Sequence, residues 1–493
     1  MRDLLLTLIV FGSLPLIFVR PHYGVYMWAW LTYMTPHRLA WGFAYDFRFN
    51  YFVALVTILA MFRSGEVRKG IPFVSPVFFW ILFIFWTTVT AMNALEPGAA
   101  WAEWDRFVKI QVLVVVTYIL IKEKKQIITL IAIIAISIGF FGFKGGLFTL
   151  IKGGYFRVMG PEYSFIADNN TFALALNMTL PLSVYFMIES KKLIVRLGLL
   201  GHNFLCVLAI FGSYSRGGLV ALISMGTVFW IFSRKKVKAI AIMVFIVPLA
   251  VSMMPDRWVN RVSPMLESLN MSFILASFPL KSLFLNDLEL PMAVSEAIVM
   301  IDELGPKKGL IKDDAEILQD LSVIGRFNAW AMARALAKDR PFLGGGFGAF
   351  TQGVFDRYTP GVFRHDAHSI YFEVLAEQGY VGLFIWIFMH LTSLRCGWWV
   401  VSRCRKDPEL SWSATLAKMV MLGFVGYYTA GISLGLAYYD LPYHYMSIIV
   451  ILYWMAKKTF KIRNDVSHET SGERRSAMRH VFPVRLSAER SLS

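Results

Sequence analysis

Runs of apolar residues recur along almost the whole chain, and they limit what it can fold into. The longer runs lie at about 4–19, 72–92, 126–143, 170–188, 193–213, 237–254, 369–394, 412–436 and 442–456, and shorter ones lie at 22–35, 50–63, 107–121 and 217–233. In lipid, each backbone group must be satisfied within its own segment, so such runs cross as helices. With 57% hydrophobic residues, we predict an all-α polytopic membrane protein of about 12 transmembrane helices (12 or 13).

Lysine and arginine gather in every second connection between these runs. They cluster at residues 63–69, 122–125, 191–196, 234–238, 395–406 and 457–463. Short loops rich in these residues stay on the cytoplasmic side, so the alternate connections are predicted to face the other side of the membrane. The first 35 residues, interrupted at Arg20-Pro21-His22, leave open whether one or two spans precede residue 50.

This alternation divides the chain into four segments. Residues 1–254 are predicted to form N-terminal transmembrane helices, 255–368 one large outer loop, 369–456 the C-terminal transmembrane helices, and 457–493 a basic, disordered cytoplasmic tail. The formal net charge of +16 comes from the cytoplasmic loops and the tail. It therefore indicates topology and contact with anionic membrane lipids, and nucleic acid is not expected as a partner.

Parts of the outer loop are expected to fold. Residues 322–350 have apolar side chains, Trp330 among them, at helical spacing, then Pro341, and then glycines at 344, 345, 346 and 348. This pattern predicts a helix followed by a turn, which we expect to lie against the membrane surface. Residues 271–285 are apolar but short, and we predict an interfacial or re-entrant helix there.

Arginines collect on the outer side, where the positive-inside rule predicts few. Arg216 lies in a very short connection beside two glycines, Arg157 lies in the connection before 170–188, and Arg326 lies in the loop helix. A guanidinium is a planar fork that matches phosphate oxygens, so these three and His365 are candidate ligands of a diphosphate. The alternative is that each side chain snorkels to lipid headgroups. That alternative is preferred for Arg257, Arg261 and Arg364.

His368 stands where the apolar run 369–394 begins. An ionisable side chain at the entrance of a membrane helix is costly unless it has a function, although a histidine can also simply lie among headgroups. Asp366 is expected to cap the helix. The free N–H groups beside His368 then favour both a neutral imidazole, as a general base needs, and an anion. His365 and His368 have the spacing of metal ligands, but no third ligand is evident, so no metal is predicted.

The residues after His368 resemble a family motif. His368-Ser369, nine residues, and then Gly379-Tyr380-Val381-Gly382 resemble the His-(Asn/Ser/Gln)-x9-Gly-x-x-(Gly/Thr/Tyr) pattern of the O-antigen ligase family. These are integral membrane enzymes with about twelve spans and one large periplasmic loop before this motif. Arg216 resembles the family's arginine in an Arg-x3-Leu pattern, with Val220 in place of the leucine. Residues 325–350 also resemble a loop helix and turn shared by O-antigen ligases and related polymerases.

The resemblance implies an inverting, metal-independent glycosyltransferase of the GT-C type that needs no cofactor. Its donor would be a glycan linked to undecaprenyl diphosphate, and its acceptor lipid A-core, at the periplasmic face of a bacterial inner membrane. Arg216 and His368 would be the catalytic residues. Arginines including Arg216 would hold the diphosphate, and His368 would take the proton from the acceptor hydroxyl. A contact of His368 with phosphate is the alternative role.

Two segments bear on the acceptor. Residues 20–43 resemble the ligase-like subgroup associated with exosortase systems, whereas residues 266–320 have no counterpart and are a candidate determinant of acceptor choice.

A polysaccharide polymerase or a protein O-oligosaccharyltransferase would use the same donor with another acceptor. A transporter of lipid-linked glycan is the alternative from another class. The concentration of charged groups on one face, and the absence of an evident inverted repeat, argue against transport.

Overall fold

The computed structural model describes the chain except for residues 234–247, 257, 259–313, 363 and 482–493. Its helices are α1 (Arg2–Val19), α2 (His22–Met34), α3 (Phe49–Arg63), α4 (Ser75–Met92), α5 (Pro97–Leu120), α6 (Lys124–Ile151), α7 (Asn169–Glu189), α8 (Leu193–Gly212), α9 (Arg216–Ile231), α15 (Asp314–Asp339), α16 (Gln352–Tyr358), α17 (Ile370–Cys404), α18 (Ser411–Ala430) and α19 (Asp440–Val481). Short 3-10 helices cover Pro36–Leu39, Phe43–Tyr45 and Glu66–Lys69. Within the described ranges there is no β-strand.

The all-α prediction is confirmed for the described residues, and each predicted apolar run except 237–254 coincides with a helix. Six helices, α1, α4, α6, α7, α8 and α17, are long and apolar enough to cross a membrane, and α3 and α9 are shorter apolar helices. The chain is therefore a multi-pass membrane protein, while the total of 12 or 13 spans stays a prediction. The first 35 residues form two helices, α1 and α2, of which α1 is among the six. Whether one or two spans precede residue 50 stays open.

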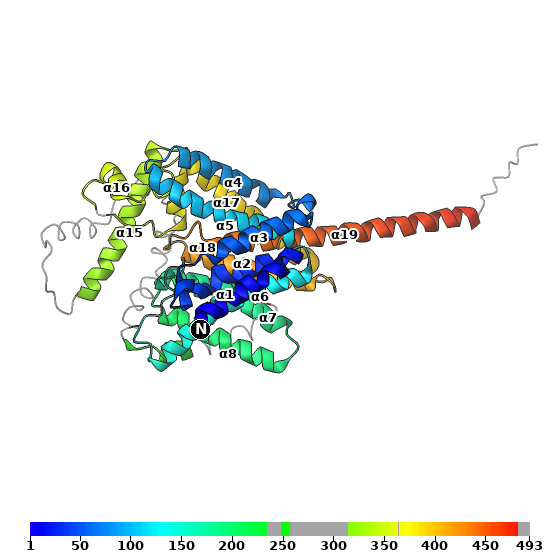
Figure 1. Ribbon diagram of the computed structural model, residues 1–493, viewed down its shortest axis with the longest axis horizontal. Coiled ribbons are helices and arrows are strands. Elements are labelled where there is room, and N and C mark those ends of the chain that lie inside the picture. Colours follow the sequence, from blue (N-terminus) through cyan, green and yellow to red (C-terminus); the bar gives the residue numbers. More distant parts are fainter. Residues whose placement is uncertain (234–247, 257, 259–313, 363, 482–493) are drawn as a thin grey trace, which may run out of the picture.

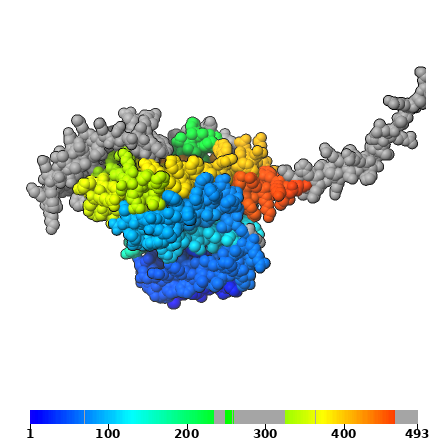
Figure 2. Space-filling view, turned by 90° about the horizontal axis from the view of Figure 1, so that it is seen from above, coloured from blue at the N-terminus to red at the C-terminus, as the bar shows by residue number. Residues whose placement is uncertain are grey.

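Several predictions fall outside the described residues. They concern the helix at 271–285, the effect of 266–320 on the acceptor, and the arginines at 257 and 261. The run 237–254 is described only from residue 248 onward. The tail was predicted to be disordered from residue 457, but α19 continues to Val481. In Figure 1, α19 projects from the end of the bundle opposite to α15 and α16. The N-terminal helices, in blue, form one side of the described molecule in Figure 2.

Glycines allow neighbouring membrane helices to approach closely. A Cβ at Gly146 of α6 would lie 2.1 Å from the Leu205 carbonyl oxygen of α8, and one at Gly142 would lie 2.7 Å from Cys206 Sγ. In lipid, helices associate through such close packing rather than through the hydrophobic effect. The helices α6 and α8 are therefore closely packed, and this packing fixes where the connection after α8 begins.

Helix α17 is interrupted at Gly379, where the backbone is left-handed (φ 65°, ψ −174°). This break frees carbonyl groups that an unbroken helix would use. The N–H groups of Gly345 and Gly346 donate to the carbonyl oxygens of Ala376 and Glu377, at 2.7 and 2.9 Å. The glycine-rich turn after α15 therefore docks on the break of α17, which ties the outer loop to a membrane helix.

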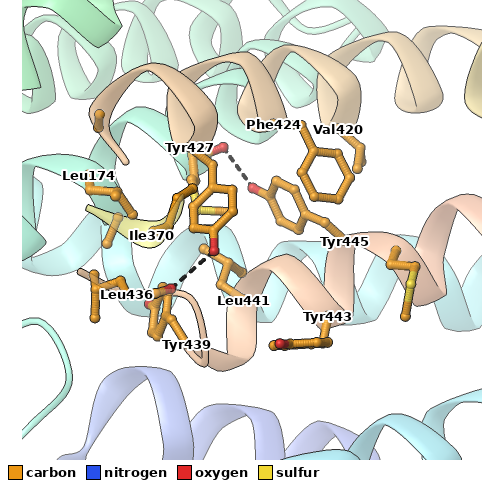
Figure 3. Packing of buried hydrophobic residues seen from close by; sticks show 14 of the residues in the cluster. Leu174, Ile370, Val420, Phe424, Tyr427, Leu436, Tyr439, Leu441, Tyr443 and Tyr445 are labelled. Carbon is orange, nitrogen blue, oxygen red and sulfur yellow. Dashed lines mark hydrogen bonds between the residues drawn. The ribbon is translucent and has the colours of Figure 1, made fainter. Parts of the chain in front are cut away.

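The core beneath the outer face is built from α7, α17, α18 and α19. Figure 3 shows Ile370, at the start of α17, packed beside Tyr427 of α18. The hydroxyl of Tyr427 donates to the carbonyl of Leu436 at 3.1 Å, and that of Tyr445 donates to the carbonyl of Met178 at 2.7 Å. Both tyrosines are fully buried, and each bond satisfies a buried hydroxyl. The first bond holds the connection between α18 and α19, residues 431–439, and the second joins α19 to α7.

Candidate functional site

The N-termini of α7, α9 and α17 gather around one place, at the end of the bundle that is predicted to face outward. Asp168 caps α7 by accepting from the N–H of Asn170 at 2.8 Å. The side chain of Asn169 donates to the carbonyl of Ser213, just before α9, at 2.7 Å. The charge of Asp168 also acts on His368, which precedes α17. Helix N-termini present free N–H groups and a positive dipole end, so the place suits an anion.

The turn before α9 fixes Arg216 as the first residue of that helix. Ser215 caps α9, accepting from the N–H of Gly218 at 3.1 Å. The preceding Tyr214 is left-handed (φ 57°), and its hydroxyl donates to the carbonyl of Gly154 at 2.6 Å. A Cβ at Gly217 would lie 2.6 Å from Ser433 Oγ. Glycine thus lets the start of α9 lie directly against the 431–439 connection.

Helix α15 brings Arg326 to the same place and confirms the predicted helix at 322–340. The indole N–H of Trp330 donates to the carbonyl of Ala367 at 2.8 Å, and its ring stacks on Phe372 at 4.9 Å. The ring of His365 covers Gly325, where a Cβ would lie 2.5 Å from Nε2. Since Arg326 lies one turn before Trp330, this docking sets its position.

His368 has a left-handed backbone, with φ 43°. Such a conformation in a non-glycine residue costs of order 1–3 kcal/mol and is often found at functional sites. The cap of α17 is Ser369, and it makes no side-chain capping hydrogen bond. The expectation that Asp366 caps the helix is wrong. The left-handed turn at His368 carries Asp366 away from the helix start, and Asp366 is exposed and lies 3.9 Å from Arg364.

The charges at this place are unbalanced. Burial, and then the charge of Arg216, lowers the pKa of Arg326, so these two guanidinium groups lie near each other. Among the described residues, neither makes an ion pair with a carboxylate, and Arg326 Nε is buried without a hydrogen-bond partner. Two unpaired guanidinium groups in a half-buried site repel each other, and a bound anion would relieve that repulsion.

The same surroundings favour neutral His368. Burial lowers its pKa below the ordinary value of 6.5, the charge of Arg326 lowers it further, and the charge of His365 acts in the same direction. Asp366 and Asp168 raise it, and Asp366 acts more strongly than His365, but burial and Arg326 are the largest effects and the pKa is lowered. A neutral imidazole can accept a proton near neutral pH, so the place combines an anion site with a base.

The structure thus brings four of the five predicted residues together: Arg216, Arg326, His365 and His368. Arg157 is exposed, and its neighbour Val158 donates to the carbonyl of Gly212 at the end of α8. Among the described residues, the side chain of Arg157 makes no hydrogen bond or ion pair that links it to the other four. In that part of the chain, no group of three or more His, Cys, Asp or Glu side chains is arranged to hold a metal ion.

Two groups near the site were missed from the sequence. Asp168 lies beside His368, and Glu373 lies in the first turn of α17, where its Oε2 accepts from the N–H of Ala437 at 2.9 Å. Glu373 and Glu377 lie four residues apart in an apolar run. Carboxylates in a membrane helix are rare and usually functional. The two glutamates in this apolar run could therefore have been recognised from the sequence as candidate functional residues.

Comparison with protein families gives two matches. Residues 203–387, from α8 to the middle of α17, match the family described as O-antigen ligase. This segment of the chain is similar to O-antigen ligases. Residues 1–191, which include Arg157 and Asp168, match a family of unknown function. No curated protein matches the chain significantly.

The ligase match spans Arg216, Arg326, His365, His368 and the break of α17. The packing around α17 gives the glycine spacing of the ligase motif a physical reason. A Cβ at Gly379 would lie 2.3 Å from the carbonyl oxygen of Phe342, and one at Gly382 would lie 3.0 Å from the Trp86 ring. The histidine of the motif faces the site, whereas its first glycine makes the break on which the loop docks. The match over 203–387 supports a role in O-antigen ligase or polymerase chemistry, for which lipid-linked glycan and membrane lipids are the implied partners.

Proposed function

We propose that the protein is an O-antigen ligase-like glycosyltransferase of the GT-C type. It moves a glycan from undecaprenyl diphosphate to lipid A-core at the periplasmic face of the bacterial inner membrane. The observation that carries the proposal is the convergence of Arg216, Arg326 and His368 at three helix N-termini. Such a place suits a diphosphate beside a base, and the family match supports the class of reaction.

The two arginines hold the donor. Arg216 and Arg326 offer planar N–H forks to the diphosphate oxygens, and the starts of α7, α9 and α17 add positive potential. As the bond from the sugar to phosphate breaks, negative charge grows on the departing oxygen. Fixed positive groups stabilise that charge in the transition state. His365, which packs on Gly325, is proposed as a further contact to the diphosphate.

His368 activates the acceptor. The acceptor hydroxyl oxygen forms a bond to the anomeric carbon from the face opposite the diphosphate, while its proton passes to the imidazole. The bond from that carbon to the diphosphate oxygen breaks, and undecaprenyl diphosphate leaves with the electron pair. The anomeric configuration inverts, and neither a metal ion nor a nucleotide takes part. The lowered pKa of His368 keeps the imidazole neutral and ready for this step.

A product-identity experiment tests the function. Purified protein receives undecaprenyl-diphosphate-linked oligosaccharide with lipid A-core, with peptide or with free glycan, in excess chelator. We expect a product with lipid A-core only. A peptide product would identify a protein O-oligosaccharyltransferase, and a glycan product a polymerase. His368→Ala should abolish product formation at unchanged abundance, and full activity in that variant would remove the proposed role of His368.

A further inference from the structure

The left-handed backbone of His368 is held from both sides. On its N-terminal side, the carbonyl of Ala367 accepts from the Trp330 indole at 2.8 Å. On its C-terminal side, the N–H of Ile370 donates to the carbonyl of Gly431 at 2.9 Å. Because an unfavourable conformation persists only when its surroundings fix it, these neighbours decide where the imidazole points.

The second of these neighbours, the 431–439 connection, passes directly under His368. A Cβ at Gly435 would lie 3.5 Å from the backbone nitrogen of His368 and 3.4 Å from Glu373 Oε2. The glycine therefore lies between the backbone of His368 and the carboxylate of Glu373. Any shift of this connection changes the support beneath His368.

Three side chains hold the middle of that connection. Tyr427 donates to the carbonyl of Leu436, Tyr443 donates to the carbonyl of Ala437, both at 3.1 Å, and Glu373 accepts from the N–H of Ala437 at 2.9 Å. The tyrosines belong to α18 and α19. Glu373 belongs to α17, and it lies five residues after His368.

We propose that Glu373 is a positioning residue: by accepting from Ala437, it ties the 431–439 connection to the first turn of α17 and so holds His368 in its working conformation. Its Oε2 bonds to backbone, so it acts through His368 and not on the substrate. An acidic group in a first helical turn is also stabilised by the helix dipole. The inference rests on the proposed role of His368 as the base.

The test compares two replacements of nearly equal size. Glu373→Gln keeps a side-chain oxygen that accepts from Ala437, whereas Glu373→Met removes the acceptor. Rates are measured with undecaprenyl-diphosphate-linked oligosaccharide and lipid A-core. We expect Glu373→Met to lower kcat at least tenfold with the donor KM within about twofold of wild type, and Glu373→Gln to keep most of kcat.

Tyr443→Phe is the matched control, because it removes the hydrogen bond to the carbonyl of Ala437 and leaves in place the bond from the N–H of Ala437 to Glu373. We expect its kcat to stay within about threefold of wild type. Wild-type kcat in Glu373→Met would overturn the positioning role, as would equal losses in Glu373→Gln and Glu373→Met, which would show that the charge is needed. Activity in His368→Ala would instead remove the proposed role of His368 as the base, so the two failures are distinguishable.

Discussion

At the scale of single residues, the planar guanidinium group of Arg216 cannot be replaced by the ammonium group of a lysine. Arg216→Lys keeps the charge but loses planar, paired donation to phosphate oxygens. A hydrogen bond to a charged group is worth about 2 kcal/mol, so we expect kcat/KM for the donor to fall roughly thirtyfold. Arg196→Lys, at the other end of α8, is the control and should leave kcat/KM unchanged. Turnover like the wild type in Arg216→Lys would indicate a snorkelling residue.

The pH dependence of transfer follows from the pKa of His368, which lies below 6.5 in the free protein. The base works when neutral, so activity falls as pH drops through this pKa. The acidic limb of kcat/KM should therefore lie below pH 6.5. Bound diphosphate raises the histidine pKa, so the limb of kcat should lie at higher pH. Arg326→Gln should move the kcat/KM limb upward. A limb above 6.5 in the unmodified protein would contradict this account.

At the scale of elements, the break of α17 depends on Gly379. Its φ of 65° disfavours other residues, and a Cβ would lie 2.3 Å from the carbonyl oxygen of Phe342. We expect Gly379→Ala to destabilise the protein by about 2 kcal/mol or more and to displace the glycine-rich turn. Gly361→Ala is a matched control, since φ is 82° there with open space around it. It should cost only about 1 kcal/mol. Equal shifts in Tm would mean that the docking contact contributes nothing.

The same element shows what the sequence could and could not predict. Apolar runs mark the helices well because burial in lipid demands them, and the helix at 322–340 follows from its spacing. The sequence does not show where an apolar helix breaks. Gly379 and Gly382 are equivalent in the sequence, and only the docking of the loop distinguishes Gly379 as the site of the break. The prediction that Asp366 caps α17 was wrong for a related reason. Local preference favours an acidic cap, but tertiary contacts hold His368 left-handed and move the helix start to Ile370.

At the scale of the whole molecule, residues distant in sequence make the candidate site. Arg216, Arg326 and His368 were each singled out from the sequence by residue type and predicted side, and the fold brings them together. Asp168 and Glu373 escaped attention because their roles arise from contacts with other segments. Charge alternation gives only the side of the membrane on which a residue lies. Which outer residues touch is decided by helix packing, and Arg157 shows that sharing a predicted side does not place a residue in the site.

Helices α1 and α2, which precede α3, also decide on which side of the membrane the N-terminus is predicted to lie. Asp3 accepts from the N–H groups of Gly42 and Ala44, at 2.9 and 3.1 Å, so residue 3 lies beside the connection between α2 and α3. If the basic connection after α3 is cytoplasmic, both must face the periplasm. A membrane-impermeant thiol reagent on intact inner membranes should label Arg2→Cys and Trp41→Cys, and Ser64→Cys only after permeabilisation. If Arg2→Cys, like Ser64→Cys, were labelled only after permeabilisation, the N-terminus would be cytoplasmic.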